Sequence, residues 1–140
     1  MSGLTHEYFK DRNSQLSRAR NRIEFAKREI VTLQTILNRH CELRGLPHYK
    51  SLKALNILDL GCGDQYIKDP ILSAGAKYTG VDIDQCNFEV DCLPFDDNEF
   101  DIIICYAVIE HLNDPNKLIS ESKRVVKQGG TIILSTPNIN

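Results

Sequence analysis

Several features common in other protein classes are missing from this chain. It has no tryptophan, only one methionine, and five residues each of Phe and Tyr among 140. No run of 18 apolar residues occurs, and residues 1–12 lack the apolar core of a secretory signal, so neither a membrane span nor a signal is expected. Basic stretches carry no interleaved aromatic residues, and this argues against a nucleic-acid partner.

The cysteines also lack a pattern. None of the five forms a CxxC pair, and their number is odd; they are Cys41, Cys62, Cys86, Cys92 and Cys105. A disulfide framework or a zinc site would need regular spacing. We therefore expect reduced thiols, a cytoplasmic protein and no metal.

Charge and composition divide the chain near residue 50. Residues 1–50 carry ten Lys/Arg and five Asp/Glu, whereas residues 51–140 carry seven and fourteen. Residues 13–44 contain neither Gly nor Pro, which predicts one long helix within an N-terminal extension, residues 1–50. The basic half is interpreted either as a solvated helix or as a face for an anionic partner.

The apolar residues of this helix repeat every three or four positions. They are Leu16, Ala19, Ile23, Ala26, Ile30, Leu33 and Leu37. Such a seam fits a helix packed over its own domain, and equally a helix pair within or between chains. Both interpretations stay open at this point.

Residues 51–140 alternate strand and helix patterns. Short apolar runs predict strands in "ALNILDL", "AKYTGVDID", "FDIIICYAV" and "TIILSTP". Between them lie a helix interrupted by Pro70 and ended by Gly75, and a clearer helix with Asp114 as cap and Gly129 as its end. The order predicts an α/β fold with a mostly parallel sheet flanked by helices.

The stretch "LDLGCGD" ends the first predicted strand with two glycines. Gly61 and Gly63 allow a sharp turn and close approach to a ligand, although a lone GxG is a weak signal. Asp82 ends the second strand, where a carboxylate can accept hydrogen bonds from ribose hydroxyls. Asp91 precedes "CLPF" at the rim of the same cleft. The three features together predict a nucleoside-binding edge.

Four motifs in this order resemble the class I S-adenosylmethionine-dependent methyltransferases. They are "LDLGCGD", "YTGVDID", "DCLPFDDNEFDIIICYAVIEHLNDP" and "ESKRVVKQGGTIILSTPN", within residues 54–138. The resemblance is strongest to the subgroup acting on small molecules, lipids and glycans. It implies a Rossmann-like core over residues 51–140, S-adenosylmethionine as cofactor, and a small-molecule, lipid or glycan acceptor.

The resemblance also implies a role for each matching residue. A loop around the methionine part of the cofactor would contain Asp59, Gly61, Cys62 and Gly63. Asp82 would hold the ribose, Ile83 would pack on the adenine, and Asp91 with the Cys92 N–H would meet the adenine edge. Cys105 and Tyr106 would border the reactive methyl group.

The loop departs from the family at one position, where Gln65 stands in place of the usual third glycine. Gln65 and Tyr66 also weaken a dinucleotide pattern, so an NAD-dependent oxidoreductase ranks third. Where the acceptor must lose a proton, His111 and Glu110 are the candidate base residues. His111 is otherwise interpreted as a partly buried histidine at the start of a helix.

Two segments are shorter than in the family: the connection between Asp82 and Asp91, and the part after the last predicted strand. Only eight residues separate Asp82 from Asp91, too few for a helix and a further parallel strand, so "NFEVD" is an edge segment or a loop. The chain ends after the fifth strand position of the family, which shortens the sheet and leaves "TIILS" as an open edge. A homodimer through this strand or the long helix is one expectation. A cofactor-binding module without catalysis is the alternative function.

Overall fold

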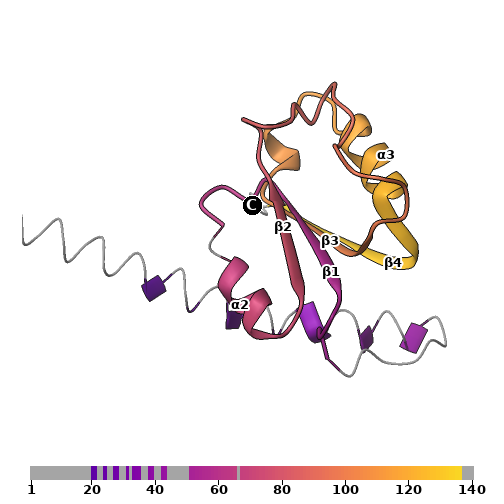
Figure 1. Cartoon of the computed structure of the whole chain (residues 1–140). Helices are drawn as coiled ribbons and strands as arrows, with labels where there is room; N and C mark the ends of the chain where they lie inside the picture. The colour runs from indigo at the N-terminus through magenta and orange to yellow at the C-terminus, as the bar shows by residue number, and fades with distance from the viewer. Residues whose placement is uncertain are drawn as a thin grey trace, which may run out of the picture.

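The computed structural model describes residues 51–65 and 67–136, together with residues 20–21, 24, 27–28, 31, 33–35, 38–39 and 42–43. Within them four strands form one sheet in the order β2-β1-β3-β4, and every neighbouring pair is parallel. The strands are β1 (Asn56–Leu60), β2 (Lys77–Val81), β3 (Phe100–Tyr106) and β4 (Val126–Ser135). Figure 1 shows them side by side, with the α2 and α3 helices beyond them. The predicted α/β fold with a parallel sheet is confirmed.

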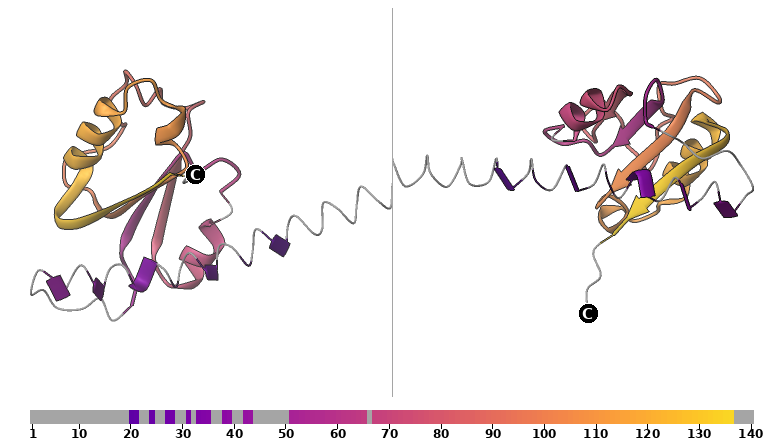
Figure 2. Two further views of the ribbon diagram at one scale, coloured as in Figure 1. Left: turned by 180° about the vertical axis from the view of Figure 1, so that it is seen from behind. Right: turned by 90° about the horizontal axis from the view of Figure 1, so that it is seen from below.

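Alternating side chains of the strands form two separate cores, one on each face of the sheet. One face packs Leu58, Leu60 and Ile103 against α3 (Asn116–Val125), which contributes Leu118 and Val125. The other face packs a second set of apolar side chains against α2 (Lys68–Ser73) and its flanks; this set includes Ile57, Ile71, Ile102, Ile104 and Ile133. The views in Figure 2 agree that α2 and α3 lie on opposite sides of the sheet.

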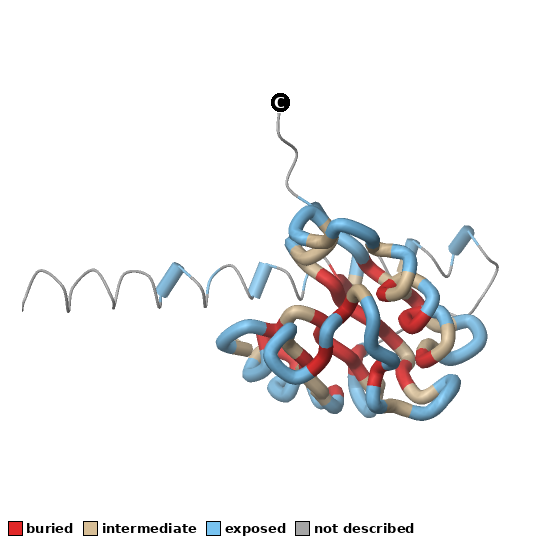
Figure 3. The backbone as a smooth tube through the Cα atoms, turned by 90° about the horizontal axis from the view of Figure 1, so that it is seen from above, coloured by how far each residue is buried: buried red, intermediate tan, exposed pale blue. Residues whose placement is uncertain are grey.

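Burial on both faces explains why the strand sequences are continuously apolar. Residues Ile102 to Cys105 of β3 are all fully buried, and Figure 3 shows the buried backbone concentrated in the centre of the molecule. A half-exposed strand would alternate apolar and polar residues instead. The three consecutive isoleucines therefore identify β3 as a central strand, in agreement with its position between β1 and β4.

Residues 82–99 connect β2 to β3 without any helix or strand. The short interval between Asp82 and Asp91 is therefore filled by a loop, which settles the alternative left open by the sequence. Three of its side chains, Cys86, Phe88 and Leu93, are buried in the core beneath α3. The loop thus covers the sheet as an additional helix would.

Both helices predicted within residues 51–140 are present, but the second one ends earlier than predicted. Pro70 lies in the first turn of α2, and the Asp114 carboxylate accepts a hydrogen bond from the Asn116 N–H at the start of α3. The prediction that Gly129 ends the second helix is wrong, because α3 ends at Val125 and β4 begins at Val126. Pairing of Val126 with Phe100 extends the strand, and Gly129 lies where the β3–β4 register shifts.

Most of the predicted N-terminal helix lies outside the described residues. The residues described between 20 and 43 are helical, and Leu33 is fully buried in the core with Ile57 and Ile71. At this seam position the helix packs over its own domain. None of the helices among the described residues is long and apolar enough to cross a membrane.

Candidate functional site

A pocket of about 260 Å³ lies at the carboxyl ends of β1, β2 and β3. Its lining combines one carboxylate with mostly apolar groups, and consists of Gly61, Asp82, Ile83, Phe88, Ala107, Val108, His111 and Leu112. Ligands of open parallel sheets bind at this edge, near the point where the strand order reverses. The order β2-β1-β3 places that reversal beside β1.

The first wall of the pocket is the glycine turn after β1. The Gly61 N–H and the Cys62 N–H both donate to the Val81 carbonyl, at 2.7 and 3.3 Å, so the turn is joined to the end of β2. Gly61 has φ +74°, and a Cβ on it would lie 2.3 Å from a methyl group of Val108. No residue with a side chain fits there without displacement of Val108.

Gln65 stands where the family usually has a third glycine, and its backbone takes the conformation that glycine favours. Its backbone has φ +55°, in the left-handed region that glycine adopts without strain. Its N–H donates to the Cys62 carbonyl at 2.8 Å, and its side-chain amide approaches the Cys62 sulfur at 4.0 Å. The turn thus keeps a glycine conformation although glycine is absent.

Asp82 and Ile83 are brought into the pocket by the end of β2. The Asp82 carboxylate accepts a hydrogen bond from the Ile83 N–H at 2.9 Å, and this fixes the side chain at the strand end. Ile83, which lines the pocket, is 59% exposed and so is accessible to a ligand there. An exposed apolar group next to a fixed carboxylate suits a nucleoside.

Asp59 lies below the pocket and does not line it. Its side chain is buried and accepts a hydrogen bond from the Tyr78 hydroxyl at 2.6 Å. Burial raises the pKa of Asp59 to about 6, the Tyr78 bond opposes this rise, and the negative charge of Asp82 adds to it. Burial, followed by the Asp59 charge, also raises the pKa of the neighbouring Cys62 thiol.

The loop of residues 82–99 forms the second wall. Phe88 lines the pocket and is almost completely buried. The adjacent Glu89 carboxylate accepts hydrogen bonds from the backbone N–H groups of Asn113 and Asp114, at 2.5 and 2.9 Å. Since those residues directly follow the lining residue Leu112, Glu89 ties this loop to the segment on the far side of the pocket.

The structure does not bring Asp91 or Cys92 into the lining. The exposed Asp91 carboxylate accepts from the Asn87 N–H at 2.8 Å and closes a local turn. Exposed Cys92 has its sulfur 3.4 Å from the Lys117 ammonium nitrogen, and its carbonyl accepts a weak bond from the Cys86 thiol. Both residues lie on the outer part of the loop.

Cys105 and Tyr106 end β3 on opposite faces of the sheet. Cys105 is fully buried in the core under α3, and burial raises the pKa of its thiol to about 12. It is therefore a neutral thiol at physiological pH. Tyr106 packs against the α2-side core. Neither side chain lines the pocket, while the next two residues, Ala107 and Val108, do.

His111 lines the mouth of the pocket from the short helix η1 (Ile109–His111). Its side chain is 77% exposed, so the interpretation as a partly buried histidine is wrong. The imidazole Nε2 lies 3.9 Å from a Glu110 carboxylate oxygen. This is an exposed base beside an acid, within reach of a bound ligand and of solvent.

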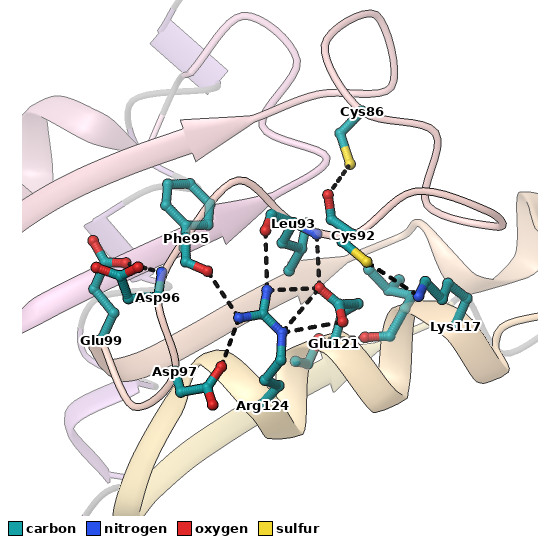
Figure 4. Close-up of polar contacts among 12 residues, drawn as sticks. Cys86, Cys92, Leu93, Phe95, Asp96, Asp97, Glu99, Lys117, Glu121 and Arg124 are labelled. Carbon is teal, nitrogen blue, oxygen red and sulfur yellow. Dashed lines mark hydrogen bonds and ion pairs between the residues drawn. The ribbon is translucent and has the colours of Figure 1, made fainter.

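A cluster around Arg124 anchors the far end of the loop to α3 (Figure 4). The guanidinium donates to the Leu93 and Phe95 carbonyls, at 3.0 and 2.8 Å, and forms ion pairs with Asp97 and Glu121. The buried Glu121 carboxylate also accepts from the Leu93 N–H at 2.7 Å. The hydrogen bond from Arg124 lowers the pKa of Glu121, which favours the ionised carboxylate.

Sequence reasoning missed half of the pocket lining. Phe88, Ala107, Val108 and Leu112 were not predicted to lie there, and neither was the bridging role of Glu89. A signal existed for Phe88, an aromatic residue in a short polar connection. The others follow β3 directly, and their position depends on η1, which has no clear sequence pattern.

Comparison with known proteins agrees with this geometry. The methyltransferase domain family matches residues 58–134, more than half of the chain. The chain belongs to the methyltransferase domain family. The methyl donor of this family is S-adenosylmethionine. The residues of the match run from β1 to β4 and include every residue that lines the pocket.

Relatives of this methyltransferase domain share part of their length with it. A "Ubiquinone biosynthesis O-methyltransferase" of Coxiella burnetii (strain Dugway 5J108-111) is 32% identical over 109 residues, which are 64% of this chain and 47% of that protein. The protein of the same name from Maricaulis maris (strain MCS10) is 30% identical over 70% of this chain and 46% of its own length. The chain spans about half the length of these relatives.

Solved structures show the same fold. A protein of Pyrococcus horikoshii OT3 aligns with a TM-score of 0.54 and 25% identity over 72% of this chain and 53% of its own. The DszA carbon methyltransferase aligns with a TM-score of 0.55 and 18% identity over 83% of this chain and 36% of its own.

The residues present fit S-adenosylmethionine. The cofactor contains a ribose with two hydroxyls, which suits the Asp82 carboxylate, and an adenine, which suits the apolar groups of Ile83 and Phe88. Among the residues that the structure describes, no group of three or more His, Cys, Asp or Glu could hold a metal ion.

Proposed function

We propose that this domain binds S-adenosylmethionine in the pocket at the ends of β1, β2 and β3 and transfers its methyl group to an acceptor oxygen. The observation that carries the proposal is the pairing of Asp82 with Ile83 and Phe88 beside Gly61. The one carboxylate can accept hydrogen bonds from the ribose hydroxyls, and the apolar groups can pack on the adenine. The glycine turn has no side chain in the way, so a ligand can approach its backbone closely.

Each wall has a part in this proposal. Asp82 accepts hydrogen bonds from the ribose hydroxyls, and Ile83 packs on the adenine. The turn containing Gly61, Cys62 and Gly63, with Asp59 beneath it, lies beside the methionine part. Asp91 and the Cys92 N–H meet the adenine edge from the outer loop. These assignments follow the resemblance to the family, and the lining positions of Gly61, Asp82 and Ile83 support theirs.

The acceptor is a hydroxyl of a small molecule, a lipid or a glycan. The relatives described above are named as O-methyltransferases, which supports oxygen as the acceptor atom. A hydroxyl must lose its proton on methylation, and His111 at the mouth of the pocket supplies a base. Glu110, at 3.9 Å, stabilises the resulting imidazolium.

When bound, S-adenosylmethionine supplies an electrophilic methyl group on a sulfonium. The protein contributes orientation: the walls hold the nucleoside, and His111 accepts the proton of the acceptor hydroxyl. Cys105 does not compete as a nucleophile, because its buried thiol stays protonated. Tyr106 borders the methyl end through the backbone at the end of β3.

Two measurements test the proposal. Calorimetry with S-adenosylhomocysteine should show binding that Asp82→Ala weakens by about tenfold or more, since charge-assisted hydrogen bonds to the ribose are lost. Transfer of a labelled methyl group to a panel of hydroxyl acceptors should be slowed by His111→Ala by about a hundredfold. Binding without transfer to any acceptor would favour a cofactor-binding module without catalysis.

We also propose that residues 51–140 form the cofactor-binding domain and residues 1–50 a helical extension packed on it through Leu33. Among the described residues β4 is an edge strand of the sheet and Leu134 is exposed, and this edge supports pairing between two copies. Light scattering on the full chain and on Leu134→Lys tests the pairing. A dimer mass that the lysine does not reduce would contradict this contact.

A further inference from the structure

Glu89 is the residue that joins the two sides of the pocket. A single carboxylate oxygen, Oε1, accepts hydrogen bonds from the Asn113 N–H at 2.5 Å and the Asp114 N–H at 2.9 Å. Phe88, the neighbour of Glu89, lines the pocket from the loop, and Leu112, the neighbour of Asn113, lines it from η1. The contact therefore spans the pocket from one lining segment to the other.

The remaining contacts of residues 82–92 do not replace this bridge. Among the described residues, their hydrogen bonds run within the same stretch, as from the Asn87 N–H to Asp91, apart from the Lys117 ammonium on Cys92. The Arg124 cluster holds the loop to α3, but only at residues 93–97 (Figure 4). Phe88 and Leu112 both pack in the core on the α3 side, and Glu89 adds the hydrogen bonds that join this part of the loop to the segment after η1.

The two N–H groups that donate to Glu89 lie at the entry to α3. Asn113 and Asp114 lie just before α3, where backbone N–H groups have no partner within the helix. A carboxylate that accepts two such groups makes short, charge-assisted bonds with a fixed geometry. Removal of the carboxylate takes away this common anchor of the loop and the segment after η1, and Glu89 itself belongs to neither core.

We propose that Glu89 is a positioning residue, which sets the separation between the loop of residues 82–99 and the η1 segment across the pocket, and thereby the affinity for the adenosine half of the cofactor. The proposal rests on the function proposed above. Glu89 does not line the pocket, so it acts through Phe88 on one side and Leu112 on the other.

Calorimetry on the full chain tests this role with two probes, S-adenosylhomocysteine and 5′-methylthioadenosine. We expect Glu89→Ala to weaken both by the same factor, about tenfold, because both contain the adenosine half. Glu89→Gln should keep most of the affinity, since its amide oxygen can accept both bonds that now end on one oxygen. Glu89→Asp, whose side chain is one methylene shorter, should bind both probes several-fold more weakly than the unaltered chain.

Glu99→Ala is the matched control. Glu99 belongs to the same loop and its carboxylate also accepts a backbone N–H, that of Asp96 at 2.8 Å, but neither residue lines the pocket or neighbours a lining residue. It should leave both affinities unchanged. The midpoint of thermal unfolding, measured without ligand for each variant, separates effects on affinity from effects on folding. Glu89→Gln should bind both probes more tightly than Glu89→Ala even where the two variants have the same midpoint.

The outcomes separate this proposal from the proposed function. If the unaltered chain binds neither probe, the proposed function fails. If it binds both, and Glu89→Ala and Glu89→Asp bind as tightly as the unaltered chain, the positioning role is wrong. A Glu89→Gln variant as weak as Glu89→Ala, or a loss for S-adenosylhomocysteine alone, would equally overturn it.

Discussion

The two walls of the pocket are held in place by different forces. The glycine turn at residues 61–65 is fixed by main-chain hydrogen bonds to Val81 and by close contact of Gly61 with Val108. The opposite wall, within residues 82–99, is fixed by charged side chains: Glu89 at one end and Arg124 with Glu121 at the other.

This difference shows how a short connection can replace regular structure. A strand would have satisfied the backbone of residues 82–99 through its neighbours in the sheet. Without one, the Leu93 N–H and the Leu93 and Phe95 carbonyls find charged partners on α3 (Figure 4). The first wall should therefore be sensitive to side-chain size, and the second to loss of charge.

The largest effect is expected at Gly61. Gly61→Ala places a Cβ 2.3 Å from Val108 at φ +74°, so overpacking and left-handed strain together should lower the free energy of unfolding by about 4 kcal/mol. Gly63→Ala is the control, because its φ is +50° but nothing lies within 4 Å of the added Cβ. It should cost about 1 kcal/mol in chemical denaturation. Equal losses would show that contact with Val108 does not shape this wall.

A somewhat smaller effect is expected at Arg124. Arg124→Ala leaves the buried Glu121 carboxylate and two loop carbonyls without their guanidinium, and should destabilise the domain by about 3 kcal/mol. Lys123→Ala, the exposed neighbour on α3, should change the unfolding free energy by less than about 0.5 kcal/mol. Similar values for the two variants would contradict a charged anchor for the second wall.

Asp59 gives the first wall a dependence on pH. Its folded pKa of about 6 lies above its ordinary value of 3.8, so the folded state binds the proton more tightly than the unfolded state does. The contribution of Asp59 to stability is thus fully present below pH 4 and falls by roughly 2 to 3 kcal/mol as pH rises to about 6. Asp59→Asn should remove this fall while it keeps an acceptor for Tyr78.

Unfolding free energies at pH 4 and pH 7 measure that dependence for both proteins. The stability of Asp59→Asn relative to the unaltered chain should increase over this interval. A difference that is constant with pH would show that the pKa of Asp59 is the same in the folded and the unfolded state.

The smallest effect is expected at Gln65. Gln65→Gly relieves a left-handed backbone at φ +55° but adds conformational entropy to the unfolded chain, so the net gain should be about 0.5 kcal/mol. Gln65→Ala retains the strain and should show no gain in the same denaturation series. If Gln65→Ala were more stable than the unaltered chain, residue 65 would not adopt the left-handed conformation.

The contrast between the walls also explains what could be predicted from the sequence. Apolar runs and glycines identified the strands and the turn with Gly61, and the end of the second strand identified Asp82, because these depend on local patterns. Ile83 was assigned through the resemblance to the family. Glu89 and Arg124 have no local pattern for these roles, since the loop and backbone partners that each one joins lie 24 to 31 residues away. Their roles depend on how the loop folds over α3.

The end of α3 was mispredicted for a related reason. Gly129 is a typical helix terminator, but Val125 and Val126 are β-branched, and Val126 pairs with Phe100 in the sheet. Strand pairing therefore begins before the glycine is reached. The long N-terminal helix could be interpreted only at Leu33, where burial in the core favours packing over its own domain.

A structure of the full chain with S-adenosylhomocysteine tests the central claim most directly. The two-walled pocket predicts that the adenosine lies beside the glycine turn and against Phe88 of the loop, facing the Val108–Leu112 segment, with the ribose hydroxyls at the Asp82 carboxylate. An adenosine bound away from Asp82, or a ligand held outside these two walls, would contradict the account.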